Sequence, residues 1–434
     1  MRIAYVTAGA AGMLCGSCLH DNTLAAAIGQ LGHAIALVPT YTPIRTDETD
    51  MSGRRVFYGA VSVYLRARSP LFRHTPRFLD RILDHPAILS RLAGRKKATR
   101  ASDLGRLALS VLMGEQGGQE RSFRDLASWL RDDFKPEIVH LTNSMFLGLA
   151  APLKRDLGVP VVCSLQGEDL FIDELVEPWR SRVIDLLREK AKDADLFIAT
   201  GKVYAEKMSD LLGIRESRVR VVSLGLNLEG QGGARAERPE GPLVIGFLAR
   251  ISPEKGFHLL AEAFRQVSER AGPGKVVLRA AGYLGPKDRP YFEEVRRRIE
   301  SWGLAGSFEY LGELDRAAKI RFLNGLDLLS VPTIYRESKG LSVLEALANG
   351  VPVVQPEHGS FPEIIENTGG GILFEPGSAE ALASALESLM GDTARRRELG
   401  DRGREAVRRL YSDEVMARDT LTVYLSALSH AGGL

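Results

Sequence analysis

Short apolar runs alternate with helical patterns along the chain. In the first half, segments such as Pro160–Leu165 are continuous apolar runs of strand length. Runs of this kind are typical of parallel strands that are buried on both faces. The predicted strands of this half are Arg2–Ala8, Ala34–Tyr41, Val56–Leu65, Glu137–Thr142, Pro160–Leu165, Leu196–Thr200 and Arg218–Leu224, and the clearest predicted helices are Glu174–Lys192 and Tyr204–Leu212.

The alternation stops at Leu226–Pro242, a stretch rich in Gly, Pro and charge that predicts a linker or hinge. It then resumes with strands at Leu243–Leu248, Lys275–Ala281, Phe308–Leu311, Leu328–Pro332, Pro352–Gln355 and Ile372–Glu375, and with helices at Lys255–Arg270, Asp288–Ser301, Arg316–Asn324 and Leu341–Asn349. We therefore expect an α/β protein with two Rossmann-like doubly wound domains. Ligands of such sheets bind beyond the carboxyl ends of the strands, so we expect a cleft where the two domains face each other.

Composition excludes several classes of protein. The 434 residues are 44% hydrophobic and 26% charged, which is the profile of a globular chain and neither a disordered nor a collagen-like one. A net charge of +2 gives no overall attraction to nucleic acid, and we expect none as a partner. No long uncharged apolar stretch predicts a membrane span. The apolar start after Met1-Arg2 is interpreted as a first strand, because no typical signal-peptide cleavage site follows it.

Three cysteines are too few for a disulfide framework and fit a cytoplasmic protein. Cys15 and Cys18 form a C-x-x-C, which is found in redox and metal sites. A zinc site needs further ligands, however, and only His20 is close in sequence, so we disfavour this interpretation. Asp193 and Asp195 form a D-x-D, for which capping or solvation at a strand start is the simpler explanation. We predict no metal requirement and no cofactor.

The segment 66–106 is strongly basic, with eleven Lys or Arg residues against three Asp. Its helical pattern predicts an insertion in the first domain, over about 66–125. A solvated helical insertion is the simpler interpretation. The alternative is a basic surface for an anionic acceptor or for peripheral contact with the inner face of a membrane.

Two cations lie where an anion is expected to bind. In the stretch GFLARISPEKG, a predicted strand ends near Arg250, and a short turn with Pro253 leads to Lys255 and the next helix. A helix start supplies N–H donors and partial positive charge, and Arg can hold a phosphate through paired hydrogen bonds. A surface Arg and Lys with no ligand is the alternative.

The stretch YRESKGLSVLEALANG contains two carboxylates. Glu337 precedes a predicted helix, Gly340 allows close backbone approach at its start, and Glu345 lies about one turn inside it. Carboxylates are good partners for vicinal diols, so one could contact a sugar and the other a ribose. An acidic first turn that only complements the helix dipole is the alternative.

Together these motifs resemble retaining glycosyltransferases of the GT-B fold, in particular glycosyltransferase family 4, also called group 1. The E-x7-E motif of that family matches Glu337 and Glu345, and its phosphate pair matches Arg250 and Lys255. The segment Gly350–Ile365 matches the strand and turn that follow. The resemblance covers nearly the whole chain except 66–125. It implies an acceptor-side domain over 1–225, a linker over 226–242, a donor domain over 243–412 and a last helix over 413–434 that crosses back to the first domain.

The resemblance implies transfer of a hexose from a UDP- or GDP-linked sugar to a hydroxyl, with retained configuration. The acceptor would be a glycan, a lipid-linked glycan or a small molecule. Arg250 and Lys255 would stabilise the leaving diphosphate, Glu337 would contact the sugar, and Glu345 the ribose. Backbone contacts to the diphosphate would come from Gly16, Gly340 and Leu341, and the base would lie against the loop that contains Gly312 and Leu314.

Three positions depart from the family pattern. Gln166 stands where the family commonly has a His that assists the reaction, and Gln cannot act as a general base. Lys339 replaces the usual aromatic residue of the E-x7-E motif, and Cys15 replaces the first glycine of the N-terminal loop. Candidate acceptor-side residues are His20, Glu168 and Asp169. His140, inside a predicted strand, is interpreted as a core histidine.

Two other functions stay open at this point. The departure at Gln166 leaves a nucleotide-sugar-binding protein without transfer activity as one alternative. Another GT-B enzyme, such as a nucleotide-sugar epimerase or a phosphorylase-like protein, is the second. The sequence does not predict an oligomeric state.

Overall fold

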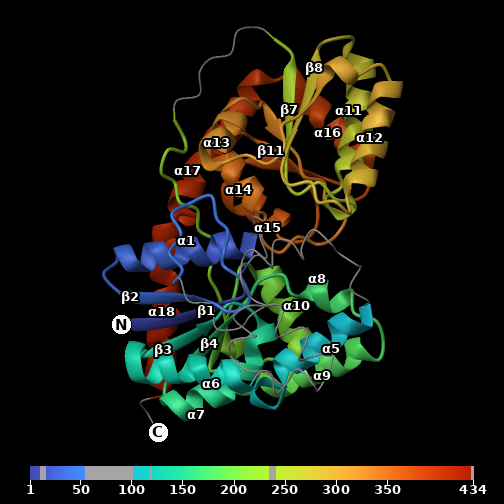
Figure 1. Ribbon diagram of the computed structural model, residues 1–434. Helices are drawn as coiled ribbons and strands as arrows, with labels where there is room; N and C mark the ends of the chain where they lie inside the picture. The colour runs from blue at the N-terminus through green and yellow to red at the C-terminus, as the bar shows by residue number, and fades with distance from the viewer. Residues whose placement is uncertain (10–15, 54–100, 118–119, 234–240, 432–434) are drawn as a thin grey trace. The chain divides into compact units, whose positions relative to one another are not determined.

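The computed structural model describes residues 1–9, 16–53, 101–117, 120–233 and 241–431. These residues form two compact units (Figure 1). Unit 1 comprises Met1–Ser223 and Met416–Leu434, and unit 2 comprises Leu224–Val415. No helix in the described part of the chain combines the length and the hydropathy that a membrane crossing needs.

Unit 1 is built on a six-stranded parallel sheet in the order β2-β1-β3-β4-β5-β6. Its strands are β1 (Arg2–Thr7), β2 (Ala34–Pro39), β3 (Ile138–Leu141), β4 (Val161–Leu165), β5 (Leu196–Ala199) and β6 (Val219–Val221). Its α-helices are α1 (Gly16–Gln30), α5 (Ala101–Leu112), α6 (Glu120–Trp129), α7 (Ala150–Leu157), α8 (Asp169–Asp173), α9 (Trp179–Lys190) and α10 (Lys202–Leu212), together with α18 (Asp413–Ala431), most of which belongs to this unit.

The central strands of unit 1 bury side chains on both faces, as their continuous apolar sequences require. Alternate residues of β1 belong to different cores. Ala4 and Val6 pack with residues of α5, α6, α7, α9 and α10, whereas Ile3 and Tyr5 pack with residues of α1 and α18. The α18 residues Met416, Ala417, Val423, Tyr424 and Ala427 are part of that second core. The last helix thus completes unit 1.

Unit 2 repeats the plan, with a six-stranded parallel sheet in the order β12-β11-β10-β7-β8-β9. Its strands are β7 (Leu243–Leu248), β8 (Val276–Ala281), β9 (Phe308–Tyr310), β10 (Leu328–Leu329), β11 (Val353–Pro356) and β12 (Gly371–Phe374). Its helices are α11 (Phe257–Ala271), α12 (Arg289–Ser301), α13 (Arg316–Asn324), α14 (Leu341–Ala348), α15 (Phe361–Thr368), α16 (Ala379–Met390) and α17 (Thr393–Leu410).

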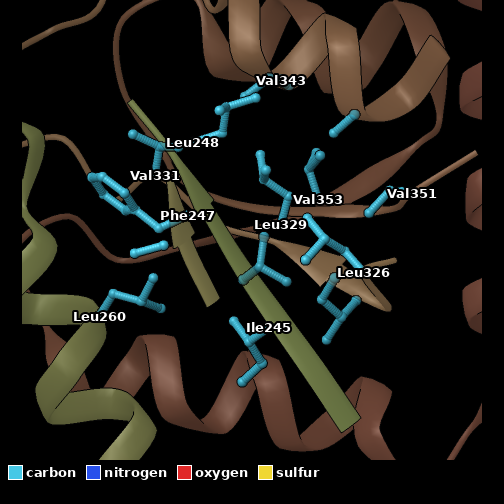
Figure 2. Close-up of a cluster of buried hydrophobic side chains, with 14 of the residues drawn as sticks. Ile245, Phe247, Leu248, Leu260, Leu326, Leu329, Val331, Val343, Val351 and Val353 are labelled. Carbon is cyan, nitrogen blue, oxygen red and sulfur yellow. The ribbon is translucent and has the colours of Figure 1, made fainter. Parts of the chain in front are cut away.

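The core of unit 2 gathers around its central strands. Figure 2 shows Ile245 and Phe247 of β7 with Leu329 of β10 and Val353 of β11, and Leu260 and Val343 reach the same cluster from α11 and α14. All of these side chains are fully buried. At about 25 cal/mol per Å² of apolar surface, each buried side chain contributes roughly 1.5–3 kcal/mol. This packing fixes the ends of the strands, where the candidate site lies.

The structure confirms the doubly wound α/β architecture and most of the predicted elements. The predicted strand Val56–Leu65 lies outside the described residues, as does the basic segment up to residue 100. The rest of the predicted insertion contains α5 and the start of α6. One helix was wrongly placed, because α9 begins at Trp179 and not at Glu174. Pro178 explains this start, since the residue before a proline is disfavoured in helical conformation.

The described part of the predicted linker is held by hydrogen bonds. Leu226 N–H donates to Tyr411 O at 2.8 Å, and Asp413 N–H donates to Leu226 O at 2.9 Å. Gly232 O accepts from Arg408 of α17 at 3.1 Å. Residues 224–233 therefore belong to unit 2, and 234–240 lie outside the described residues.

Candidate functional site

The turn after β7 presents two cations. Arg250 follows the strand, and Lys255 ends a single 3-10 turn, Pro253–Lys255, just before α11. Gly256 joins that turn to the helix at φ +73°, and a Cβ on it would lie 1.8 Å from Pro332 O. A glycine is therefore needed here for the chain to pass close to the end of β10.

Each of these cations is paired with a carboxylate. Arg250 pairs with Glu254, and both side chains are a little over a third exposed. Lys255 Nζ lies 2.6 Å from Glu337 Oε2 in a more enclosed pair, in which the side chains are 18% and 14% exposed. Lys255 Nζ also donates to the Tyr335 hydroxyl at 2.5 Å. Lys255, Glu337 and Tyr335 thus form one hydrogen-bonded group. Arg250 lies at the start of the same turn, and its charge acts on Tyr335.

Glu337 is held tightly by its own turn. Its Oε1 accepts from the backbone N–H groups of Ser338 at 3.1 Å and Lys339 at 3.3 Å. Its carbonyl accepts from Ser360 N–H at 2.7 Å. Burial acts to raise the pKa of Glu337, but the charge of Lys255 and the hydrogen bonds from Lys255 and Tyr335 outweigh it and lower that pKa to about 2. Glu337 is therefore a carboxylate at neutral pH, able only to accept hydrogen bonds.

Two glycines of the candidate site, Gly340 and Gly312, have a left-handed backbone. Gly340 adopts φ +66° immediately before Leu341, the first residue of α14. A Cβ on Gly340 would come within 2.6 Å of the Ile364 side chain. Gly312, in the loop after β9, adopts φ +70°, and its carbonyl accepts from Gly282 N–H at 2.8 Å. Leu314 is partly buried against the core of unit 2.

Glu345 lies in α14 and is almost fully buried, at 6% exposed. Its Oε1 pairs with Lys319 Nζ of α13 at 2.5 Å. The sequence motif identified Glu345 but not this partner. Lys319 is on a different element, and no local pattern links the two positions.

In unit 1, Gln166 follows β4 and has a fixed amide orientation. Its Nε2 donates to Asp21 Oδ1 at 2.9 Å and to Thr142 O at 3.0 Å. A reversed amide would place Oε1 against two acceptors, so this orientation is the favourable one. Oε1 is buried and has no hydrogen-bond partner among the residues that the structure describes.

Asp21 is the centre of a buried polar network that sequence reasoning missed. Besides Gln166, its carboxylate accepts from the hydroxyls of Tyr5, Thr7 and Thr142 at 2.5–2.6 Å. Burial acts to raise the pKa of Asp21, but its contact with His20 and the hydrogen bonds from Thr142 and Thr7 lower that pKa to about 2. The available signal was that Asp21 is the only acidic residue of α1.

The other predicted residues of unit 1 have structural partners. His20 is buried, with Nδ1 3.2 Å from Asp21 Oδ1. Glu168 accepts from the backbone N–H groups of Ser144 and Gln166 at 3.0 and 2.6 Å. Asp169 pairs with Lys207 Nζ at 2.5 Å. These contacts fix the segment after β4 and leave Glu168 and Asp169 largely buried.

Gly16 is the first residue of α1, and a Cβ on it would meet no described residue within 4 Å. The described residues therefore give no steric reason for glycine at this position. Cys18 is buried, whereas Cys15 lies outside the described residues, so the C-x-x-C pair is not described as a whole.

The remaining predictions concern structural residues. His140 is a core histidine: its Nδ1 and Nε2 lie 2.7 Å from Tyr424 Oη and Ser164 Oγ, respectively, and burial lowers its pKa to about 3. In the D-x-D, Asp195 accepts from Lys154 Nζ and from Val161 N–H, each at 2.7 Å. Across the described residues, no three His, Cys, Asp or Glu side chains form a group that could hold a metal ion.

Comparison with known proteins gives two family matches. Residues 234–406 match the model described as "Glycosyl transferases group 1", and residues 22–225 match the "Glycosyl transferase 4-like domain". The first match contains the cluster around Lys255 and Glu337. The second contains Gln166 and Thr142, and it begins at residue 22, directly after Asp21.

Curated and solved relatives agree with these matches. The chain is 31% identical over 179 residues to phosphatidyl-myo-inositol mannosyltransferase of Mycobacterium leprae, which covers 41% of this chain and 45% of that protein. It is 25% identical over 299 residues to glycogen synthase of Mycobacterium tuberculosis H37Rv, covering 68% and 70%. The structure of Anabaena HepE in complex with UDP and glucose aligns over 98% of this chain and 100% of that one, with TM-score 0.68 and 16% identity.

Proposed function

This chain belongs to the group 1 glycosyltransferase family and has the GT-B fold, and on that basis we propose that it moves a hexose from a UDP- or GDP-linked sugar to a hydroxyl acceptor. The transfer retains the configuration of the sugar and needs no metal ion. The acceptor is a glycan, a lipid-linked glycan or a small molecule. A nucleotide sugar as donor is supported by relatives such as HepE, whose structure contains UDP and glucose.

The observation that carries the proposal is the grouping of Arg250, Lys255 and Glu337 around the turn between β7 and α11. Two cations beside a helix start suit a diphosphate. Negative charge develops on the diphosphate as the glycosidic bond breaks, and preorganised cations stabilise it. Glu337, an acceptor-only carboxylate, suits a sugar hydroxyl. Glu345, with Gly340 before it, suits the ribose.

Gln166 limits the mechanism. A carboxamide cannot take a proton from the acceptor, so the reaction cannot depend on this side chain as a base. In the proposed front-face reaction, the acceptor oxygen attacks the anomeric carbon on the side that the diphosphate leaves. A leaving phosphate oxygen takes the acceptor proton. The role left to Gln166 is to position a ligand.

The test is turnover with a panel of UDP- and GDP-sugars and hydroxyl acceptors, including water. We expect release of the nucleoside diphosphate with one base, unaffected by EDTA, and NMR detection of a product that keeps the donor's anomeric configuration. An inverted product would contradict retention, and loss of rate with EDTA would contradict metal independence. Tight donor binding without turnover for any acceptor would favour the second candidate, a nucleotide-sugar-binding protein, which the replacement of the usual His by Gln166 supports.

A further inference from the structure

The carboxylate of Glu337 is saturated with hydrogen-bond donors. Its Oε2 accepts from Lys255 Nζ and from the Tyr335 hydroxyl, each at 2.6 Å. Its Oε1 accepts from the backbone N–H groups of Ser338 and Lys339. An ionised carboxylate has about four lone-pair positions and no proton to donate. The protein itself thus fills every acceptor position of this carboxylate.

A sugar hydroxyl can reach Glu337 only if one of these donors withdraws. The two backbone donors belong to a fixed turn, because Ser360 N–H anchors the Glu337 carbonyl at 2.7 Å. Gly359, at φ +63°, passes so close that a Cβ on it would lie 2.5 Å from Glu337 O. The donor that withdraws must therefore be one of the two side chains, Lys255 or Tyr335.

Charge distinguishes these two side chains. The Lys255 ammonium has three N–H groups and is attracted by a diphosphate, which carries more negative charge than one carboxylate. The Tyr335 hydroxyl is neutral, and burial together with the charge of Glu337 raises its pKa, so it stays a donor to that carboxylate. Tyr335 also lies beneath Lys255, whose Nζ is 4.9 Å from the ring centroid.

We infer that Tyr335 makes sugar binding at Glu337 dependent on the diphosphate. Because Tyr335 fills the second position on Oε2, that oxygen becomes available only when a diphosphate draws Lys255 away. Tyr335 is thus a positioning residue that couples the part of the donor site that binds the sugar to the part that binds the diphosphate. This inference rests on the proposed function and adds to it an order of events within unit 2.

The consequence is cooperative binding of a nucleoside diphosphate and a free hexose. Coupling between two ligands is reciprocal and typically amounts to about 5–150-fold in affinity. In Tyr335→Phe, one position on Oε2 is open even while Lys255 stays in place. Hexose binding then no longer needs the diphosphate. The factor by which each ligand raises the affinity for the other falls toward one.

The experiment is calorimetric titration of UDP, GDP and ADP, alone and with saturating D-glucose, D-mannose or D-galactose. We expect wild type to bind one nucleoside diphosphate at least about fivefold more tightly with the matching hexose. Tyr335→Phe is expected to show less than about twofold coupling. Tyr411→Phe is the matched control, since it removes another largely buried hydroxyl, which accepts from Asn367 at 3.1 Å, and should keep wild-type coupling.

Two results would overturn the inference: coupling in Tyr335→Phe equal to that of wild type, or binding of the nucleoside diphosphate by wild type with no coupling to any hexose. Lys255→Met provides a second route if Tyr335→Phe does not fold, because it also opens Oε2 and should bind hexose equally with and without nucleotide. Failure of wild type to bind any nucleoside diphosphate would instead overturn the proposed function, and this inference with it.

Discussion

At the scale of single residues, Asp21 shows how this fold keeps a charge inside unit 1. Its carboxylate is fully buried and accepts from three hydroxyls and the Gln166 amide. Isolated charges are costly to bury, and hydrogen bonds to the charged form offset that cost. The network joins β1, α1 and Thr142, the residue after β3, to the segment that carries Gln166. Asp21 is therefore expected to hold this end of the sheet and the Gln166 side chain in place.

The first prediction concerns the pH dependence of stability. The folded-state pKa of Asp21, about 2, lies below its ordinary value of 3.8. Between these values the unfolded state binds more protons, so Asp21 contributes stability above about pH 4 that is lost as the pH falls toward 2. The contribution is about 2 kcal/mol. Asp21→Asn should lower the free energy of unfolding by about that amount at neutral pH, measured by urea denaturation.

The same substitution should also flatten the decline of stability between pH 4 and pH 2. Asp210→Asn, at an exposed position of α10, is the control and should change neither quantity by more than about 0.5 kcal/mol. An unfolding free energy of Asp21→Asn equal to that of wild type at neutral pH would show that the network does not stabilise the fold.

At the scale of elements, the junction between the Pro253–Lys255 turn and α11 controls the position of both cations. Gly256 has a left-handed backbone and is packed against Pro332 O. Gly256→Ala should destabilise unit 2 by more than the roughly 1–2 kcal/mol that left-handed backbone alone costs an alanine. Gly274→Ala is matched to it, with φ +71° but open space around the added Cβ. Comparing the denaturation midpoints of the two variants separates the cost of the steric contact from the cost of the left-handed backbone. An equal loss of stability in both variants would contradict this account.

Helices and strands were predicted well from the sequence where neighbouring residues carry the pattern. Continuous apolar runs identified the strands. Apolar residues spaced three to four positions apart identified most helices. The wrong start of α9 arose because an acidic, helix-compatible stretch precedes Pro178, and the proline determined where the helix begins. Arg250, Lys255, Glu337 and Glu345 were identifiable because each occupies a short motif. Lys319 and the Asp21 network were not, since their contacts join elements that are far apart in sequence.

At the scale of the whole molecule, the chain returns to its first unit through α18. Tyr424 is fully buried there, and its hydroxyl lies 2.7 Å from Nδ1 of His140 of β3. Tyr424→Ala should destabilise unit 1 by about 3–5 kcal/mol, as expected for loss of a large buried side chain. Leu425→Ala, at a neighbouring position that is 58% exposed, should cost less than about 0.5 kcal/mol.

Hydrogen exchange shows which of the two units is destabilised in Tyr424→Ala. Amides of β1 and β3 should lose protection in Tyr424→Ala, while those of β7 and β8 keep theirs. Equal loss of protection in both sheets would show that α18 does not act through unit 1.

The most direct test of the central claim, that unit 2 holds a nucleotide sugar at Arg250 and Glu345, is a thermal-shift screen against UDP-, GDP- and ADP-sugars. A donor at about 100 times its dissociation constant should stabilise the protein by about 2.7 kcal/mol. The account predicts a shift with UDP- or GDP-linked donors only, lost in Arg250→Ala and Glu345→Ala. The shift should be kept in Arg402→Ala, where an arginine is paired with a glutamate four residues away, as Arg250 is, but in α17. No shift with any donor in a cooperatively unfolding protein, or an undiminished shift in both site variants, would contradict it.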